Sequence, residues 1–192
     1  MNDKKYIITI AGKLGSGKSS TAKMVAEILN YKHYSTGDFM RDMANKKNIS
    51  LAELSKMAEA DESIDKELDD HNLEIGKMND VVLDSRLGFH FIPKSFKVFL
   101  DLDPSIASER ILEDKKSNPN RSTEATGFDT KENIMESINT RLLSERKRYK
   151  NLYGIEDLTD HNNFDLVVDT SKSPLVDVSK KVAEEYNKWI NK

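Results

Sequence analysis

The stretch that decides the fold is GKLGSGKS, residues 12–19, which fits the pattern G-x-x-x-x-G-K-[ST]. It follows a short β-branched run, Tyr6–Ile10, and it opens a segment, Ser19–Leu29, whose apolar residues recur at helical spacing. The glycines permit the backbone to turn successive N–H groups inward around phosphate oxygens. The N-terminus of the following helix adds a partial positive charge. The stretch therefore predicts a phosphate-binding loop between a buried strand and a helix.

Chemical roles within this loop follow from the residue types. Lys18 is expected to reach the β- and γ-phosphates of a nucleoside triphosphate, and the Ser19 hydroxyl to ligate Mg²⁺. Asp84, at the end of a later apolar run, could hold the Mg²⁺ shell through water, or it could be a strand-end turn residue. ATP and Mg²⁺ are therefore the expected cofactors. The loop residues expected to bind ATP are Gly12, Gly15, Ser16, Gly17, Lys18, Ser19 and Ser20.

Five short apolar runs alternate with helical stretches along the chain. They are Tyr6–Ile10, Tyr31–Tyr34, Asp80–Asp84, Phe96–Asp101 and Phe164–Asp169. Such runs are typical of strands that are buried on both faces of a parallel sheet. The sequence thus predicts an α/β fold, a three-layer P-loop NTPase domain with a five-stranded parallel sheet.

The 192 residues are expected to form a single domain. Its core is expected to comprise residues 1–36, 80–114 and 151–192. Residues 37–79 are predominantly helical, and Ser50 is the expected N-cap of one of these helices. Residues 115–130 are polar and lie between two helical patterns, which is typical of a plain loop or of a lid over a site.

The composition excludes several classes of protein. The absence of cysteine excludes disulfides, thiolate nucleophiles, zinc ribbons and iron–sulfur clusters, and it fits a cytoplasmic location. The formal net charge of −3 argues against binding to nucleic acid or to an anionic membrane through bulk charge. No apolar run approaches the length of a membrane span. We therefore expect small-molecule nucleotides as partners, no nucleic acid, no membrane, and a monomer or homodimer.

Arginine is unevenly distributed, whereas lysine is scattered over the whole chain. The seven arginines are Arg41, Arg86, Arg110, Arg121, Arg141, Arg146 and Arg148. The planar guanidinium group suits phosphates and carboxylates because it can bind them with two parallel hydrogen bonds. Confinement of arginine to a few segments therefore indicates phosphate-binding roles there.

A helix over about 131–150 would place two apolar and three charged residues on a single face. The set is Ile134, Ile138, Arg141, Glu145 and Arg148. A surface helix normally keeps its charges away from its apolar stripe, so this continuation indicates a cleft in which a ligand neutralises the charges. Arginines suit phosphates, and a carboxylate can accept from a cytosine amino group. A series of i,i+4 salt bridges is the alternative.

Further segments occur in a characteristic order and spacing. They are Tyr34–Asp38 followed by Arg41, Ile64–Asp69, Val82–Leu87, Arg141–Tyr149 and Tyr153–Ile155. Together with the phosphate loop they resemble the short, type 2 cytidylate kinases, from about Ile7 to Ser173. The resemblance implies a P-loop nucleoside monophosphate kinase in which residues 37–79 bind the acceptor nucleotide and residues 115–130 form a lid. It also implies transfer of the γ-phosphoryl group of MgATP to CMP and dCMP.

The resemblance implies the site residues as well. Arg41 and Arg86 would hold the acceptor phosphate, whereas Arg110 and Arg121 would close onto the donor phosphates. The implied catalytic residues are Lys18, Arg41, Arg86, Arg141 and Arg148. The implied substrate-binding residues are Ser35, Thr36, Asp38, Arg41, Asp65, Asp69, Arg86, Arg141, Glu145 and Arg148.

One position departs from the family pattern. Longer cytidylate kinases have an aspartate after the strand-end arginine, whereas Leu87 stands here. Recognition of the base or sugar would then fall to other carboxylates, of which Asp65, Asp69 and Glu145 are the candidates. Asp65 and Asp69 could equally cap or solvate their own helix.

Two other interpretations stay open from the sequence. An acceptor phosphate needs no general base because its second ionisation lies near pH 6, whereas a hydroxyl acceptor needs a positioned carboxylate, which Asp38 could supply. The chain could therefore be a P-loop kinase of a hydroxyl metabolite or of another nucleoside monophosphate. It could also be a non-catalytic nucleotide-binding module.

Overall fold

The computed structural model describes residues 4–117 and 130–192, and the side chain of Arg141 lies outside this description. One sheet of five parallel strands has the order β2-β3-β1-β4-β5. The strands are β1 (Ile7–Gly12), β2 (Lys32–Ser35), β3 (Val81–Asp84), β4 (Phe96–Asp101) and β5 (Leu166–Asp169). The predicted five-stranded parallel sheet is confirmed, with strand ends that differ from the apolar runs by up to two residues.

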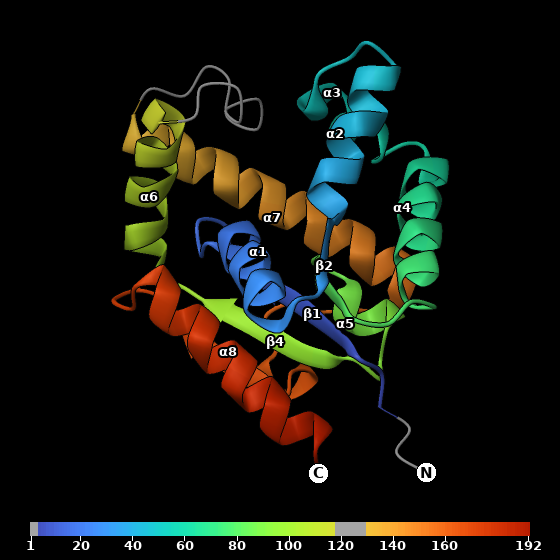
Figure 1. Cartoon of the computed structure of the whole chain (residues 1–192). Helices are drawn as coiled ribbons and strands as arrows, with labels where there is room; N and C mark the ends of the chain where they lie inside the picture. Colours follow the sequence, from blue (N-terminus) through green and yellow to red (C-terminus); the bar gives the residue numbers. More distant parts are fainter. Residues whose placement is uncertain (1–3, 118–129) are drawn as a thin grey trace.

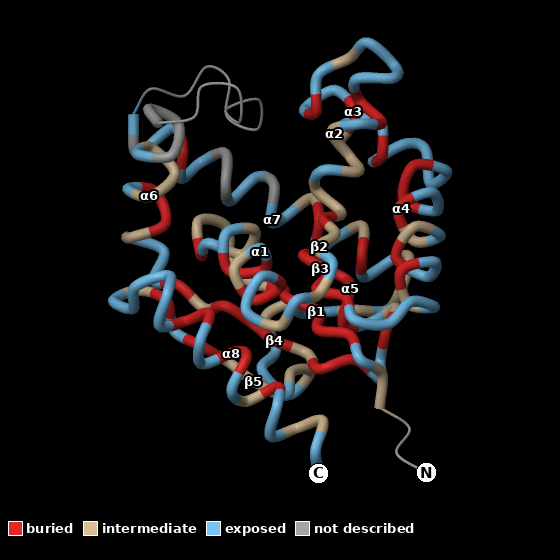
Figure 2. The backbone as a smooth tube through the Cα atoms, viewed as in Figure 1, coloured by how far each residue is buried: buried red, intermediate tan, exposed pale blue. Residues whose placement is uncertain are grey.

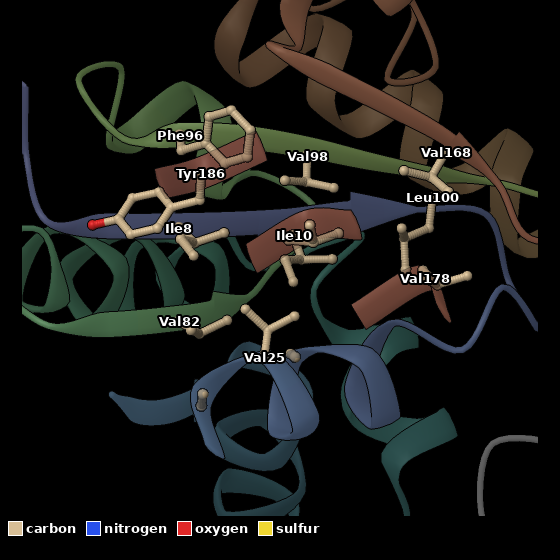
Figure 3. Packing of buried hydrophobic residues seen from close by; sticks show 13 residues of the cluster. Ile8, Ile10, Val25, Val82, Phe96, Val98, Leu100, Val168, Val178 and Tyr186 are labelled. Carbon is tan, nitrogen blue, oxygen red and sulfur yellow. The ribbon is translucent and has the colours of Figure 1, made fainter. Parts of the chain in front are cut away.

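Both faces of the sheet are covered by helices. Accordingly, β1 and β3 are coloured as buried along most of their length in Figure 2. Helices α1 (Lys18–Leu29) and α8 (Leu175–Ile190) pack on one face. Figure 3 shows Ile8 and Ile10 of β1 beside Val25 of α1 in this layer. On the other face Ile7 packs against Ile75 and Ile92. Alternate residues of β1 are therefore buried on opposite sides, which explains its continuous apolar run.

A helical region follows β2 and has a small core of its own. Its helices are α2 (Thr36–Lys46), α3 (Leu51–Met57) and α4 (Glu62–Ile75). The expected N-cap at Ser50 is present, because its hydroxyl accepts from the backbone N–H of Glu53 in a complete capping box. Met43, Leu54 and Leu68 belong to one buried apolar cluster that ties the three helices together. In Figure 1 this region stands above the sheet at the upper right.

Two longer helices complete the opposite side of the site. Helix α6 (Pro104–Ser117) follows β4, after the short α5 (Gly88–Phe91), and α7 (Lys131–Tyr153) runs from beside α6 to beside α4 (Figure 1). Helix α7 extends three residues beyond the expected Lys150 and ends at Gly154, which adopts the left-handed conformation with φ 70°. Among the described helices none is both long and apolar enough to span a membrane.

Because all five strands are parallel, their carboxyl ends meet at one edge of the sheet. The phosphate loop follows β1, α2 follows β2, and Asp84 ends β3. In α/β sheets of this kind, ligands bind beyond this edge. The fold thus brings the predicted site segments together, although they are far apart in the sequence.

Candidate active site

The phosphate loop between β1 and α1 is shaped by close backbone packing. A Cβ atom on Gly12 would lie 2.4 Å from the carbonyl oxygen of Leu100, because β1 and β4 are paired at this position. Gly15 and Gly17 have φ values of 76° and 81°, which favour glycine. The N–H of Lys13 donates to the Leu100 carbonyl over 3.1 Å, which fixes the start of the loop on the neighbouring strand.

The predicted catalytic and metal-binding groups of this loop lie at the start of α1. Lys18 Nζ donates to the carbonyl of Lys13 over 3.3 Å, across the loop. Ser19 Oγ donates to the Asp84 carboxylate over 2.5 Å. The pairing of β1 with β3 places Asp84 there, since Ile10 and Asp84 are register partners.

The Ser19 and Asp84 oxygens are suitable groups for a divalent cation. Hydroxyl and carboxylate oxygens are the hard donors that Mg²⁺ prefers, and Mg²⁺ usually takes only one or two protein ligands beside phosphates and water. In the described residues no group of three or more His, Cys, Asp and Glu side chains could enclose a metal ion. The donor set therefore fits a metal that arrives with a nucleotide. The nearby Ser16 hydroxyl is buried and has no hydrogen-bond partner in the described structure.

The start of α2 contains four of the predicted substrate-binding residues. Ser35 caps α2, because its hydroxyl accepts from the N–H of Asp38 over 3.3 Å. Thr36 donates to the side chain of Asn72 in α4 over 3.0 Å. Asp38 and Arg41 form an ion pair on the first turn of the helix. Partial burial opposes ionisation of Asp38, but the hydrogen bond and charge of Arg41 outweigh it and lower the pKa of Asp38.

Two buried carboxylates pair with arginines of the predicted acceptor site. Glu145 on α7 is 6% exposed and pairs with Arg86, which follows β3. Asp65 on α4 is 3% exposed, and its Oδ2 lies 2.9 Å from Nε of Arg148 on α7. Burial raises the pKa of Asp65 despite the opposing charge of Arg148. The charged half of α7 therefore faces other elements, and both ion pairs cross between elements. A ligand that neutralises these charges stays a prediction.

Asp69 lies one turn after Asp65 and contacts the end of α7. The hydroxyl of Tyr153 donates to its carboxylate over 2.7 Å. Burial raises the pKa of Asp69, and the hydrogen bond from Tyr153 opposes this shift. The Tyr153 ring also packs against Phe91 and Tyr149. Asp65 and Asp69 thus link α4 to α7 and do not merely solvate their own helix.

The predicted donor-side arginines differ in position. Arg110 lies at the carboxyl end of β5, where Nη2 donates to the carbonyls of Thr170 and Ser171 over 2.7 and 3.2 Å. It therefore contacts the loop after β5, and its role at the donor phosphates stays a prediction. Arg121 lies outside the described residues. The backbone of Arg141 lies one turn before Glu145 on α7.

Two features of the site were missed by the sequence analysis. Lys13 forms an ion pair with Asp101 at the end of β4, 2.6 Å away. A cavity of about 170 Å³ also lies behind the phosphate loop, and its mostly apolar lining includes Leu14, Phe99, Leu102 and Leu142. The position of Asp101 at the end of an apolar run could have indicated the ion pair with Lys13. The cavity depends on how α6 and α7 pack, for which the sequence carries no local signal.

Comparisons with known proteins indicate the family to which the chain belongs. The model of the cytidylate kinase-like family matches residues 7–172. A cytidylate kinase from Pyrococcus horikoshii is 35% identical over 169 residues, covering 88% of this chain and 81% of that protein. One from Natronomonas pharaonis is 37% identical over 169 residues, covering 86% and 81%.

A longer relative and a solved structure extend the comparison. An S-adenosylmethionine-dependent nucleotide dehydratase from Lacinutrix mariniflava is 33% identical over 96% of this chain, which spans only 36% of that protein. The crystal structure of a shikimate kinase from Bacteroides thetaiotaomicron matches 97% of this chain and 98% of its own with a TM-score of 0.64. At 14% identity, this likeness concerns the fold alone. From its family match and its cytidylate kinase relatives, the chain belongs to the cytidylate kinase-like family.

Proposed function

We propose that the protein transfers the γ-phosphoryl group of MgATP to CMP and dCMP, giving ADP and the corresponding diphosphate. The observation that carries this proposal is a cavity whose lining joins Gly12 and Lys13 of the phosphate loop to the Arg86–Glu145 ion pair. Arg41 lies on the helix that follows the neighbouring strand β2. The family membership supports the same acceptor. The absence of cysteine is compatible with a cytoplasmic site of action.

On the donor side, the phosphate loop would bind the triphosphate through its N–H groups and Lys18. The Lys18 side chain extends across the loop, so its ammonium group can stabilise the negative charge that develops on the β- and γ-phosphates. Ser19 and Asp84 would hold Mg²⁺, one directly and one through water. The metal, when bound, neutralises charge on the β- and γ-phosphates. Thr170, Ser171 and Arg110 would lie beside the adenine end of the nucleotide.

On the acceptor side, arginines would bind the phosphate that is to be phosphorylated. An oxygen of this phosphate forms the new bond to the γ-phosphorus while the bond from that phosphorus to the bridging β–γ oxygen breaks, and ADP leaves. The attacking oxygen is already ionised near neutral pH, so no side chain has to remove a proton. The lowered pKa of Asp38 supports this chemistry, because a strongly ionised carboxylate is a poor general base for a hydroxyl.

Glu145 and Arg86 provide a means of recognising cytosine. The amino group of cytosine is a donor, and the Glu145 carboxylate is an acceptor that is nearly inaccessible to water. Arg86 beside it offers guanidinium donors for the acceptor atoms of the same base edge or for the phosphate. Uracil has a carbonyl oxygen where cytosine has its amino group, so it would face the carboxylate with a second acceptor. The pair thus favours cytosine over uracil.

An acceptor panel tests the proposal. We would incubate the protein with MgATP and CMP, dCMP, UMP, AMP, GMP, shikimate or gluconate, and measure ADP formation. CMP and dCMP should be the fastest acceptors. If no pyrimidine monophosphate were turned over faster than AMP or GMP, the proposal would be wrong.

The variant Asp38→Asn separates the two kinds of acceptor chemistry. For a phosphate acceptor we expect a modest loss of kcat, because Asp38 only supports Arg41. For a hydroxyl acceptor, the same change would abolish turnover while leaving both ligands bound. Arg41→Ala serves as the comparison, because it should cause a severe loss with CMP.

A further inference from the structure

Three acidic side chains between α3 and the middle of α4 contact α7 at successive points. The contacts join Glu59 to Ser144 at 2.5 Å, Asp65 to Arg148 at 2.9 Å, and Asp69 to Tyr153 at 2.7 Å. Residue numbers rise together along both segments, so the contacts form one seam. We call these three contacts the acidic seam. It connects the helical region to the helix that bears the candidate acceptor arginine.

The central contact of the acidic seam has a distinctive geometry. Asp65 lies against Nε of Arg148, which is the inner nitrogen of the guanidinium group. A guanidinium carries one N–H on Nε and four on its two terminal nitrogens. Asp65 Oδ2 and Arg148 Nε form an ion pair without hydrogen-bond geometry, so the carboxylate holds the guanidinium near α4 by charge. The terminal nitrogens of the guanidinium can still bind a second anion. Glu145 lines the cavity beside the phosphate loop, whereas Asp65 is not part of that lining, so Asp65 is less well placed to meet a substrate itself.

Stability alone does not account for a carboxylate at this position. Removing two charges from water costs free energy, and their mutual attraction offsets this cost only when the geometry is good. Apolar residues often stabilise such a position equally well. Burial raises the pKa of Asp65, so the carboxylate is ionised there at a cost. Burying the Asp65 charge beside Arg148 therefore contributes little to stability, and orientation of Arg148 is the better explanation for it.

We propose that Asp65 is a positioning residue, which orients the guanidinium of Arg148 toward the acceptor phosphate. The outer contacts, Glu59 with Ser144 and Asp69 with Tyr153, fix how α7 lies along α4. This inference rests on the proposed function, because it takes Arg148 to bind the acceptor. It differs from the predicted role of Asp65 as a substrate-binding residue, because in this inference Asp65 acts through Arg148.

The test is a double-mutant cycle between Asp65→Asn and Arg148→Ala, with KM and kcat measured separately for the acceptor and for ATP. Asp65→Asn alone should raise KM for the acceptor about 10- to 100-fold, because a misplaced binding group costs about that much. KM for ATP should stay within about twofold, since the donor loop does not touch this pair. In the Arg148→Ala background, Asp65→Asn should cause no further loss.

The matched control is Asp70→Asn, a neighbouring acid on α4 that is exposed. It should leave both KM values unchanged. Tyr153→Phe is a second, milder variant that removes only the hydroxyl on Asp69. It should raise KM for the acceptor about 3- to 10-fold with kcat retained, and it keeps the inference testable if Asp65→Asn folds poorly.

Additive losses in the double mutant would overturn the inference, because they would show that Asp65 contributes independently of Arg148. An unchanged acceptor KM in Asp65→Asn and Tyr153→Phe would also overturn it. The wild-type acceptor panel decides the proposed function separately, and the cycle is then run with the fastest acceptor from that panel. Failure of the positioning role therefore appears in the cycle alone.

Discussion

The proposed donor and acceptor sides of this site are built in different ways. The donor side is one contiguous loop, 12–19, whose shape follows from glycines and from packing on β4. The acceptor side is assembled from α2, the end of β3, α4 and α7, and its arginines are paired with Asp38, Glu145 and Asp65. The first is a property of local sequence, whereas the second exists only after long-range packing. Substitutions should therefore act differently on the two sides.

The largest effect is expected on the donor side, from Lys18→Ala. In the described structure, Lys18 is the loop cation that extends across to the Lys13 carbonyl. Its loss should reduce kcat about 1,000-fold, because charge stabilisation supplies most of phosphoryl-transfer catalysis. Steady-state kinetics with the best acceptor measures this. Lys13→Ala is the control in the same loop, since Lys13 pairs with Asp101, and it should cost less than about tenfold. Equal losses in the two variants would contradict the role of Lys18.

On the acceptor side, Glu145→Gln should change selectivity more than overall turnover. The amide keeps the size of the side chain but can donate to the carbonyl oxygen of uracil, and it removes the charge beside Arg86. We expect kcat/KM for CMP to fall about 100-fold and the preference for CMP over UMP to shrink. Competition between the two nucleotides measures the preference. Glu156→Gln, an exposed partner of Lys150, is the control and should leave the preference unchanged.

The same contrast explains what the sequence could predict. The loop, the five strands and the capped helix at Ser50 depend on local pattern and were predicted with small errors at their ends. Helical periodicity also identified the charged face of α7. It could not reveal that Glu145 meets Arg86 or that Asp65 meets Arg148, because those partners are about 60 and 80 residues away in the chain and pair through tertiary packing. The contact of Arg110 with the loop after β5 could not be predicted for the same reason.

A third prediction concerns how rigidly the donor loop is held by the sheet. In Gly12→Ala the new Cβ would meet the Leu100 carbonyl at 2.4 Å, and backbone cannot move away as a flexible side chain would. The free energy of unfolding should fall by about 2 kcal/mol, as for other overpacked sites. Urea unfolding measures this free energy.

Gly154→Ala is the matched control, because a Cβ there has nothing within 4 Å and only the positive φ is strained. It should cost about 1 kcal/mol, and an equal cost in both variants would exclude the clash with β4.

The smallest effect is expected at His33 on β2, the strand that leads into the acceptor side. Burial lowers the pKa of His33, although the nearby Asp84 and Asp38 charges oppose the shift. Below its ordinary pKa of 6.5, the unfolded chain therefore binds more protons at this position than the folded chain, so stability should decrease as the pH falls from about 7.5 to 5.5. His33→Leu should make the loss of Tm over this range smaller by a few degrees.

Burial also lowers the pKa of His71. The variant His71→Leu should therefore remove part of the remaining dependence of Tm on pH. If neither change flattened the dependence of Tm on pH, carboxylates and not these histidines would control the acid limit of the fold.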